Sequence, residues 1–426
     1  MEKFDAIIVG GGLAGLAAAY TLAQADKEVL LLERGDYAGA KNVTGGRMYV
    51  RTIREFFPDL WSKAPLERSI THEELCLLSS DRSLTVRYDD KETSEQPQSY
   101  SVLRAKFDKY FAKQAERKGA SIVCKSRVDD LLRAGGKVCG VRAGGEELWA
   151  EVVIACDGVH SFLAEQAGLR SKHKAEHFAV GFKEIIEIDR EVLNNRFNLA
   201  DEEGAARLYM GDVTDGKFGG GFLYTNRESV SLGIVLGIEE YAEHGAIPAY
   251  ELLDRFKQRP EVAALIRGGQ TVEYAAHVIP EGGLSVMPKL FGNGILVAGD
   301  AAGFSMNIGL TVRGMEYAMM SGHLAAQAVI KAKERDDFSA SALAVYEELL
   351  KKSFVMQDFA NFREALPALD NPRLFQRYPE LVCAIMHDLY DIPSGPKRNL
   401  IPTVKKHIQA SELPRFGKDL WRLRKL

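Results

Sequence analysis

A glycine-rich turn near the start of the chain constrains its fold more than any other feature. The sequence Gly10-Gly11-Gly12-Leu13-Ala14-Gly15 matches GxGxxG and follows a short apolar run, residues 4–9. After it come an alanine-rich segment with helical spacing, residues 13–25, and a second apolar run, residues 28–33. This order predicts a βαβ unit that binds a dinucleotide, with its phosphates at the N-terminus of the helix.

The residues of this unit also narrow the choice of ligand. Gly10 permits the tight turn, Gly12 lets a diphosphate approach the backbone, and Gly15 lets the helix pack closely on the strand. Glu33 ends the second apolar run, where an acid accepts hydrogen bonds from an adenosine ribose and disfavours a 2′-phosphate. The ligand is therefore expected to be FAD or NAD rather than NADP.

Composition indicates a globular protein of two or three domains. The 426 residues are 46% hydrophobic and 27% charged, and the net charge of −4 gives no reason to expect a nucleic acid partner. The five cysteines form no CxxC motif, so we expect reduced thiols, no metal site and a cytoplasmic location. No signal peptide is expected at Met1, and no apolar run reaches the 18 residues of a membrane span.

Strand-like and helical segments alternate in a way that predicts an α/β fold with three regions. A discontinuous Rossmann-like domain is expected over residues 1–70, 100–175 and 290–335. Five β-like segments with glycine turns predict an antiparallel sheet, the substrate or quinone domain, over residues 71–99 and 176–289. The remaining residues, 336–426, have a helical pattern, and the last thirty carry a net charge of +7.

Two further motifs distinguish FAD from NAD. Asp157-Gly158 and Gly299-Asp300 each follow an apolar strand-like run, and both resemble motifs of the flavoprotein class typified by p-hydroxybenzoate hydroxylase. The resemblance implies that Asp300 holds the ribityl chain of FAD and that Arg104 lies near the FAD phosphates. The alternatives are a solvated charge at a helix start for Arg104 and a turn aspartate for Asp157. Three ordered motifs in one chain favour FAD.

The chain has no second GxGxxG on a βαβ unit and no CxxxxC, so the flavin must be reduced by something that docks transiently, namely a nicotinamide, a substrate or another redox protein. Five longer blocks bear on this choice: residues 41–49, 180–184, 219–224, 282–284 with 287–290, and 309–318. These blocks resemble electron-transfer-flavoprotein:quinone oxidoreductase (ETF-QO), and more closely its shorter relative, the FixC-type flavoprotein of Fix/Etf electron-bifurcating complexes.

The resemblance implies an FAD-dependent oxidoreductase that accepts electrons from the α and β subunits of an electron-transfer flavoprotein. It implies a small ferredoxin-like iron–sulfur subunit, a quinone, or both as acceptors. It does not distinguish between nitrogen fixation, carnitine and fatty-acid metabolism as the pathway served. Because clustered cysteines are missing, we expect no C-terminal ferredoxin domain like that of ETF-QO, and the polar residues 89–97 stand where ETF-QO has an apolar membrane plug. The chain is therefore expected to be cytoplasmic, at most peripheral to the inner face of the membrane.

The motifs and the resemblance together give a set of expected FAD contacts. We expect the backbone of residues 307–314 and the following helix to face the pyrimidine edge of the flavin, with Arg313 adding positive charge. Alternatively, Arg313 balances Glu316, and Asn307 and Thr311 are helix caps. The full set is Gly10, Gly12, Leu13, Ala14, Gly15, Glu33, Arg34, Gly46, Arg47, Arg104, Val128, Asp157, Gly158, Gly299, Asp300, Asn307, Gly309, Leu310, Thr311 and Arg313.

Other functions remain open at this level. An aromatic-ring hydroxylase or a geranylgeranyl-type reductase shares the flavin fold and would act on a small or prenyl substrate, and an FAD-bound scaffold would not react at all. His160, His277 and His323 lack acid partners in the sequence and are interpreted as structural. The basic tail either docks an acidic subunit, touches anionic lipid through apolar residues such as Trp421, or is simply solvated.

Overall fold

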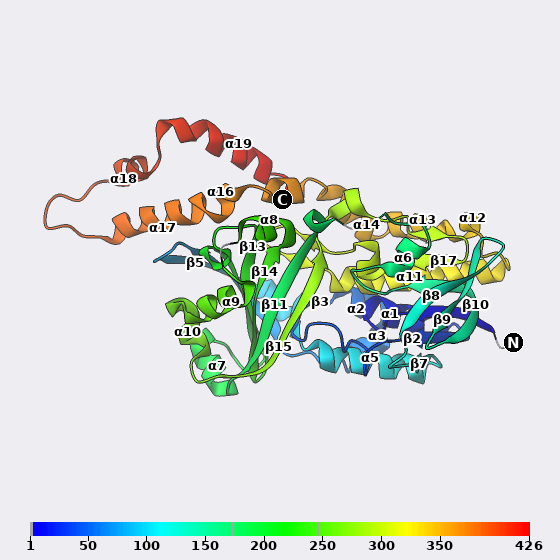
Figure 1. The fold of residues 1–426 in the computed structure, drawn as a ribbon. Helices are drawn as coiled ribbons and strands as arrows, with labels where there is room; N and C mark the ends of the chain where they lie inside the picture. Colours follow the sequence, from blue (N-terminus) through cyan, green and yellow to red (C-terminus); the bar gives the residue numbers. More distant parts are fainter. Residues whose placement is uncertain (1–2, 172–173, 246) are drawn as a thin grey trace.

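Residues 3–32 fold into the βαβ unit that the glycine turn predicts. The computed structural model describes residues 3–171, 174–245 and 247–426 (Figure 1). In it, β1 (Lys3–Val9) and β2 (Val29–Leu32) pair in parallel, and α1 (Leu13–Gln24) connects them. Helix α1 is buried along almost its whole length, because its alanines let it lie between the sheet and two other helices.

A mostly parallel sheet extends from this unit, in the order β16-β17-β10-β1-β2-β7. Along the chain its strands alternate with those of the second sheet, so three separate stretches of sequence build this layer. Helices α5 (Arg104–Arg117) and α11 (Met315–Glu334) pack against α1. The other strands are β7 (Ser121–Val123), β8 (Val128–Ala134), β9 (Lys137–Ala143), β10 (Glu146–Ala155), β16 (Phe291–Gly292) and β17 (Ile295–Val297).

The second sheet has the order β15-β11-β14-β13-β12-β4-β6-β3, with β5 beside β4. Figure 1 shows it standing next to the first domain. Its strands are β3 (Gly46–Tyr49), β4 (Ser69–Leu78), β5 (Ser83–Asp89), β6 (Ser99–Val102), β11 (Phe178–Glu187), β12 (Glu203–Gly211), β13 (Gly219–Thr225), β14 (Ser229–Gly237) and β15 (Gln270–Pro280).

Two expectations about this sheet are wrong. It is mixed rather than antiparallel, because β12 and β4 pair in parallel across a long connection that leaves no hairpin signal in the sequence. Strands β3 and β6 also belong to it, although residues 46–49 and 100–102 were expected in the first domain. Each has only four residues, with polar side chains such as Arg47 and Ser99, so neither stands out as an apolar run.

The two faces of the second sheet have different roles. One face forms an apolar core with side chains of α7, α9 and α10, including Leu193, Phe256 and Val262. The opposite face is turned toward the first domain. The helices of this region are α7 (Arg190–Phe197), α8 (Ile238–His244), α9 (Ala249–Gln258) and α10 (Pro260–Ile266).

The C-terminal region is helical, as expected, and its first part covers α11 while its later part packs on the second sheet. Figure 1 shows α17 and α18 extending away from the body of the molecule, with α19 returning toward it. These helices are α12 (Ala340–Leu343), α13 (Val345–Lys352), α14 (Phe354–Asn361), α15 (Ala365–Leu369), α16 (Pro372–Phe375), α17 (Arg377–Tyr390), α18 (Leu400–His407) and α19 (Leu413–Leu423). Short elements elsewhere are α2 (Arg51–Phe56), α3 (Pro58–Trp61), α4 (Lys91–Glu95), α6 (Phe162–Gln166), β18 (Met306–Asn307) and β19 (Val312–Arg313).

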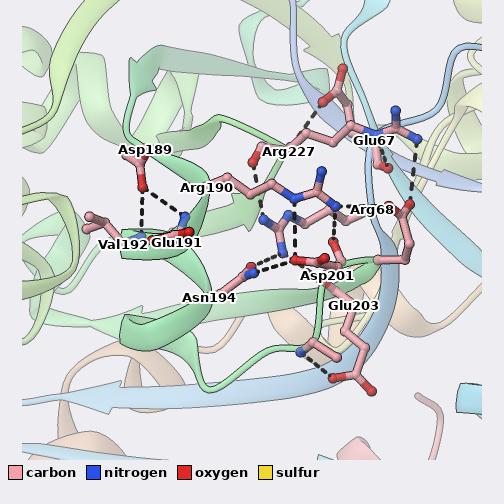
Figure 2. Close-up of polar contacts among 12 residues, drawn as sticks. Glu67, Arg68, Asp189, Arg190, Glu191, Val192, Asn194, Asp201, Glu203 and Arg227 are labelled. Atoms are coloured by element: carbon pink, nitrogen blue, oxygen red, sulfur yellow. Dashed lines mark hydrogen bonds and ion pairs between the residues drawn. The ribbon is translucent and has the colours of Figure 1, made fainter.

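A buried arginine fixes the place where the chain enters the second sheet. Arg68 is fully buried just before β4, and Figure 2 shows it among residues of α7, of the start of β12 and of the turn that carries Arg227. It donates hydrogen bonds to the carbonyl oxygen of Asn226 (2.7 Å) and to Oδ1 of Asn194 (2.7 Å). It also donates to the carbonyl oxygens of Glu203 (2.9 Å) and Arg227 (3.2 Å). Burial lowers the pKa of Arg68, and these neutral acceptors satisfy the charge instead of a direct ion pair.

Candidate functional site

A cavity of about 830 Å³ lies between the two sheets. Its lining comes from the glycine turn and the ends of β2 and β10 on one side, and from β11 to β15 on the other. The carboxyl ends of parallel strands and the turns after them are where dinucleotides bind in α/β folds. The cavity therefore occupies the position that the motifs predict.

The glycine turn is shaped for a ligand at one position and for close packing at two others. A Cβ at Gly10, whose φ is +107°, would overlap the carbonyl oxygen of Cys156, and a Cβ at Gly15 would overlap that of Gly10. At Gly12 the nearest atom to such a Cβ is Nδ2 of Asn42, at 3.7 Å. No side chain caps the N-terminus of α1 there, so its first N–H groups face the cavity with room for an anion.

Glu33 lies at the expected end of β2 and also holds the turn together. Its Oε2 accepts a hydrogen bond from the backbone N–H of Gly11 (2.7 Å), and its Oε1 accepts one from Gly35 (2.6 Å). The side chain lines the cavity and is 6% exposed. Each carboxylate oxygen has a second lone pair, so a ribose hydroxyl can still donate to it.

Two partly buried aspartates line the same cavity. Oδ2 of Asp157 accepts a hydrogen bond from the N–H of Leu163 (3.0 Å), whereas Oδ1 is buried without a partner in the described part of the chain. Burial raises the pKa of Asp157 to about 6. Burial also raises the pKa of Asp300, and the nearby charge of Arg104 opposes this shift. One oxygen of Asp157 therefore holds the turn that leads into α6, and the other can accept a hydrogen bond from a ligand.

Arg104 begins α5, as expected, but it is not solvated. Its guanidinium makes two contacts of 2.7 Å with the carboxylate of Asp108, and its side chain is 12% exposed. Asp108 is fully buried, and its carboxylate lies directly against the backbone of Gly39. Arg104 lines the cavity and is paired with the buried Asp108, so the alternative of a solvated helix-start charge is wrong.

The segment before α11 differs in part from the expectation. Residues 306–313 form a small hairpin, β18 and β19, and Gly314 is the N-cap of α11, so neither Asn307 nor Thr311 caps this helix. Arg313 contacts Glu316 (2.6 Å) and Asp358 (2.6 Å). The expectation of a free positive charge at Arg313 is therefore wrong, because two carboxylates neutralise it, and the alternative pairing with Glu316 is present.

Most of the expected FAD contacts meet in this one cavity although they are distant in the sequence. Three residues of that set do not line it. Gly15 packs helix α1 against the turn, and Leu310 and Thr311 lie at the tip of the hairpin, where Leu310 is 65% exposed. The residues that line it are Gly10, Gly12, Leu13, Ala14, Glu33, Arg34, Gly46, Arg47, Arg104, Val128, Asp157, Gly158, Gly299, Asp300, Asn307, Gly309 and Arg313.

Three ionisable residues of the cavity were not singled out as functional from the sequence. Burial and the charge of Arg104 lower the pKa of Lys183 to about 7 and that of His277 to about 4. Burial raises the pKa of Glu281 to about 7. Strand alternation could have indicated Lys183, which shares a β11 face with Gly181, but nothing in the sequence shows which face of a strand meets a cavity.

The second sheet also contributes an apolar part of the cavity. Strands β12, β13 and β14, the residue before β13 and two C-terminal helices, α15 and α16, line this part. The apolar residues are Leu208, Met210, Phe218, Phe222, Val235, Leu369 and Phe375. Such a wall suits a hydrophobic ring or chain better than a charged substrate. The cavity therefore combines a polar, glycine-lined end with an apolar side.

Several other features of the described residues bear on function. The five cysteines are free thiols in this structure. Among residues 3–171, 174–245 and 247–426, no three histidine, cysteine or acidic side chains meet as a metal site would require. A helix long and apolar enough to cross a bilayer is likewise not found in these residues.

Family models match three parts of the chain. They are an FAD binding domain over residues 3–192, an ETF-QO ubiquinone-binding model over residues 178–279, and the ETF-QO/FixC family C-terminal domain over residues 367–426. The FAD binding model spans the glycine turn, Glu33, Arg104 and Asp157, and the open N-terminus of α1 and the orphaned Oδ1 of Asp157 fit such a cofactor.

Curated relatives match over nearly the whole chain. The chain is 47% identical to the protein FixC of Salmonella typhi, over 98% of this chain and 97% of that protein. It is 45% identical to a probable electron transfer flavoprotein-quinone oxidoreductase of Escherichia coli strain K12, with the same coverage. A solved structure of a geranylgeranyl bacteriochlorophyll reductase-like protein from Thermoplasma acidophilum covers 99% of this chain and is itself fully covered, with a TM-score of 0.74 at 23% identity.

These similarities confirm the expected Rossmann-like flavoprotein fold, FAD as the cofactor, and the resemblance to FixC-type proteins. The likeness to the reductase-like structure concerns the fold alone. The chain belongs to the ETF-QO/FixC family and is an FAD-dependent oxidoreductase.

Proposed function

We propose that the chain accepts electrons from an electron-transfer flavoprotein, holds them on its FAD, and passes them to a quinone or to a small ferredoxin-like iron–sulfur subunit. The observation that carries this proposal is the joint cavity. The residues matched by the FAD model and those matched by the ubiquinone-binding model line the same space. The name of the Escherichia coli relative supports the donor and the quinone.

The polar end of the cavity is the proposed FAD site. The N–H groups after Gly12 would bind the diphosphate, Glu33 the adenosine ribose, and Asp300 the ribityl chain. Oδ1 of Asp157 would accept a hydrogen bond from the cofactor that the protein itself does not supply. The bound flavin supplies the electron transfer, and the chain positions it and sets the charge around it.

The apolar side of the cavity is the proposed quinone site. Leu208, Phe222 and Phe375 come from two strands and a C-terminal helix and form an apolar wall beside the polar end. Apolar surroundings would strengthen any hydrogen bond to a quinone oxygen. Arg47 also lines this space, and its guanidinium pairs with Glu73, which reduces its charge toward the cavity.

The C-terminal helices are the proposed partner surface. Residues 397–426 carry a net charge of +7, and Leu413, Leu420 and Trp421 are exposed on α19. Opposite charge steers association, so an acidic iron–sulfur subunit would dock here, and the same surface would allow peripheral contact with the inner face of the membrane. We place the chain in the cytoplasm. Copurification of a two-subunit flavoprotein and a small iron–sulfur protein with the tagged chain tests the partners.

A reoxidation assay tests the quinone site. The protein is reduced anaerobically and then mixed with a short-chain ubiquinone, and the return of flavin absorbance is followed. Leu208→Asp places a charge on the apolar wall, and we expect reoxidation to slow at least tenfold while the oxidised spectrum is retained. Val86→Asp is the control, since Val86 is 57% exposed on β5 and outside the cavity lining. Equal rates in both variants would rule out this site for the quinone.

A further inference from the structure

Lys183 lies on β11 on the face of the second sheet that is turned toward the first domain. Its neighbours on the strand, such as Phe182, pack against the apolar core on the opposite face. Lys183 lines the cavity, and only 9% of it is exposed. The lysine side chain is therefore inside the molecule and is directed at the proposed cofactor site.

This buried ammonium group has no anion of its own. In the described part of the chain, Nζ of Lys183 makes no hydrogen bond or ion pair, and it lies over the ring of Phe222, 5.6 Å from the ring centroid. A charged group that is largely removed from water and lacks a partner is energetically unfavourable, which is why such groups are rare.

The charged groups around Lys183 make this situation more unfavourable. Arg104 of α5 repels it, and Glu273 of β15 is the acid that attracts it, but the burial effect is larger than both. His277, two residues along β15 from the position opposite Lys183, lies on the same face, and its pKa of about 4 leaves it uncharged at neutral pH. Arg104 is already paired with Asp108. When Lys183 is protonated, its charge on the cavity wall therefore has no direct counter-ion among the described residues.

FAD brings the charge that is missing here. Its diphosphate is anionic, and its ring gains negative charge on reduction. A charge-assisted hydrogen bond between an ammonium group and either anion is among the strongest polar contacts in proteins.

We propose that Lys183 is a cofactor-binding residue of the second sheet, whose ammonium group pairs with negative charge on the bound FAD. The protein leaves this lysine without an internal partner, and the cofactor provides one when it joins the two sheets. The inference depends on FAD binding and not on the electron donor, the quinone or the iron–sulfur subunit.

The first test measures FAD binding and apoprotein stability in Lys183→Met, Lys183→Arg and the control Lys113→Met. Lys113 is exposed on α5 and is outside the cavity lining. We expect the dissociation constant for FAD to rise about tenfold or more in Lys183→Met and to change little in Lys183→Arg. The apoprotein of Lys183→Met should unfold at the same temperature as wild type or higher, because methionine removes a buried charge.

The midpoint potential of the bound FAD distinguishes the two anions. If the lysine pairs with the diphosphate, Lys183→Met weakens binding and leaves the potential unchanged. If it pairs with the ring, the potential of Lys183→Met falls, because reduced FAD loses its counter-ion. Either result supports the proposal. A dissociation constant and a potential that both equal those of Lys113→Met would overturn it.

A measurement on the wild-type chain needs no variant. Reductive methylation of apoprotein, read by mass spectrometry of the peptide that carries Lys183, should label this amine, and saturation with FAD should protect it. Lys113 should be labelled equally in both states. Equal labelling of Lys183 with and without FAD would contradict a direct contact.

Discussion

Nη1 of Arg313 lies 2.6 Å from Oδ2 of Asp358, so the C-terminal helix α14 supplies a carboxylate to an arginine that lines the cavity. The hydroxyl of Tyr317 donates a hydrogen bond to the same oxygen (2.9 Å). Glu316 is the second carboxylate beside Arg313. The charge at this edge of the cavity is therefore set by residues of two helices.

Removing one of these carboxylates should make FAD easier to reduce. In Asp358→Asn the positive charge of Arg313 is less compensated, so reduced flavin is stabilised by about 1 kcal/mol, which is roughly 20 mV for a two-electron couple. Potentiometric titration of the holoprotein measures this rise. Glu364→Gln, an exposed acid in the same region, is the control. An unchanged or lower potential in Asp358→Asn would contradict the arrangement.

Substitutions at two glycines of the turn should have different effects, one on the stability of the apoprotein and the other on its affinity for FAD. Gly15→Ala forces a Cβ onto the carbonyl oxygen of Gly10, and we expect the apoprotein to lose about 2–3 kcal/mol of unfolding free energy. Gly12→Ala meets no such obstacle and should stay within about 1 kcal/mol of wild type, yet bind FAD weakly. Urea unfolding and FAD titration measure the two effects. Normal FAD affinity in Gly12→Ala would show that the diphosphate lies elsewhere.

The buried arginine at the start of the second sheet should be important for stability. Arg68→Met leaves the carbonyl oxygens of Asn226 and Glu203 without their donor, and we expect a loss of about 3 kcal/mol or more in urea unfolding. Arg363→Met changes an exposed arginine, so its unfolding free energy should match wild type. Similar values for both variants would mean that the contacts of Arg68 contribute little.

Glu281 should make the apoprotein less stable as the pH rises. Its pKa is raised from an ordinary 4.5 to about 7 in the folded chain, so the folded state holds this proton more tightly than the unfolded state between these values. This contribution to stability is present below pH 4.5 and is lost as the pH rises toward 7. The unfolding temperature of Glu281→Gln should therefore fall less than that of wild type as the pH rises from 4.5 to 7. The unfolding temperature of the control Glu334→Gln should fall as much as that of wild type. Parallel curves for wild type and Glu281→Gln would refute the assignment.

The parts of the fold that the sequence predicts are those with a local signal. The glycine turn, Glu33 and the helix that starts at Arg104 follow from spacing and residue type, because a βαβ unit has a fixed order along the chain. Strands β3 and β6 were assigned to the wrong domain because four residues with polar side chains give no periodic pattern. The parallel pairing of β4 with β12 depends on a crossover that the sequence does not reveal.

The candidate site shows the same division. Motifs place Asp157 and Asp300 at the ends of strands, and both line the cavity. The pairing of Arg313 with Asp358 joins positions 45 residues apart and depends on how α14 packs, so no local pattern predicts it. Lys183 looks like an ordinary polar residue of a strand, and only the arrangement of the two sheets shows that it is buried.

Anaerobic stopped-flow reduction tests the central claim most directly. The holoprotein is mixed with NADH alone, or with NADH and an electron-transfer flavoprotein that NADH reduces, and the absorbance of its FAD is followed. The account predicts slow or no bleaching with NADH alone and fast bleaching when the flavoprotein is present. Fast bleaching by NADH alone, at the same rate with and without the flavoprotein, would contradict it.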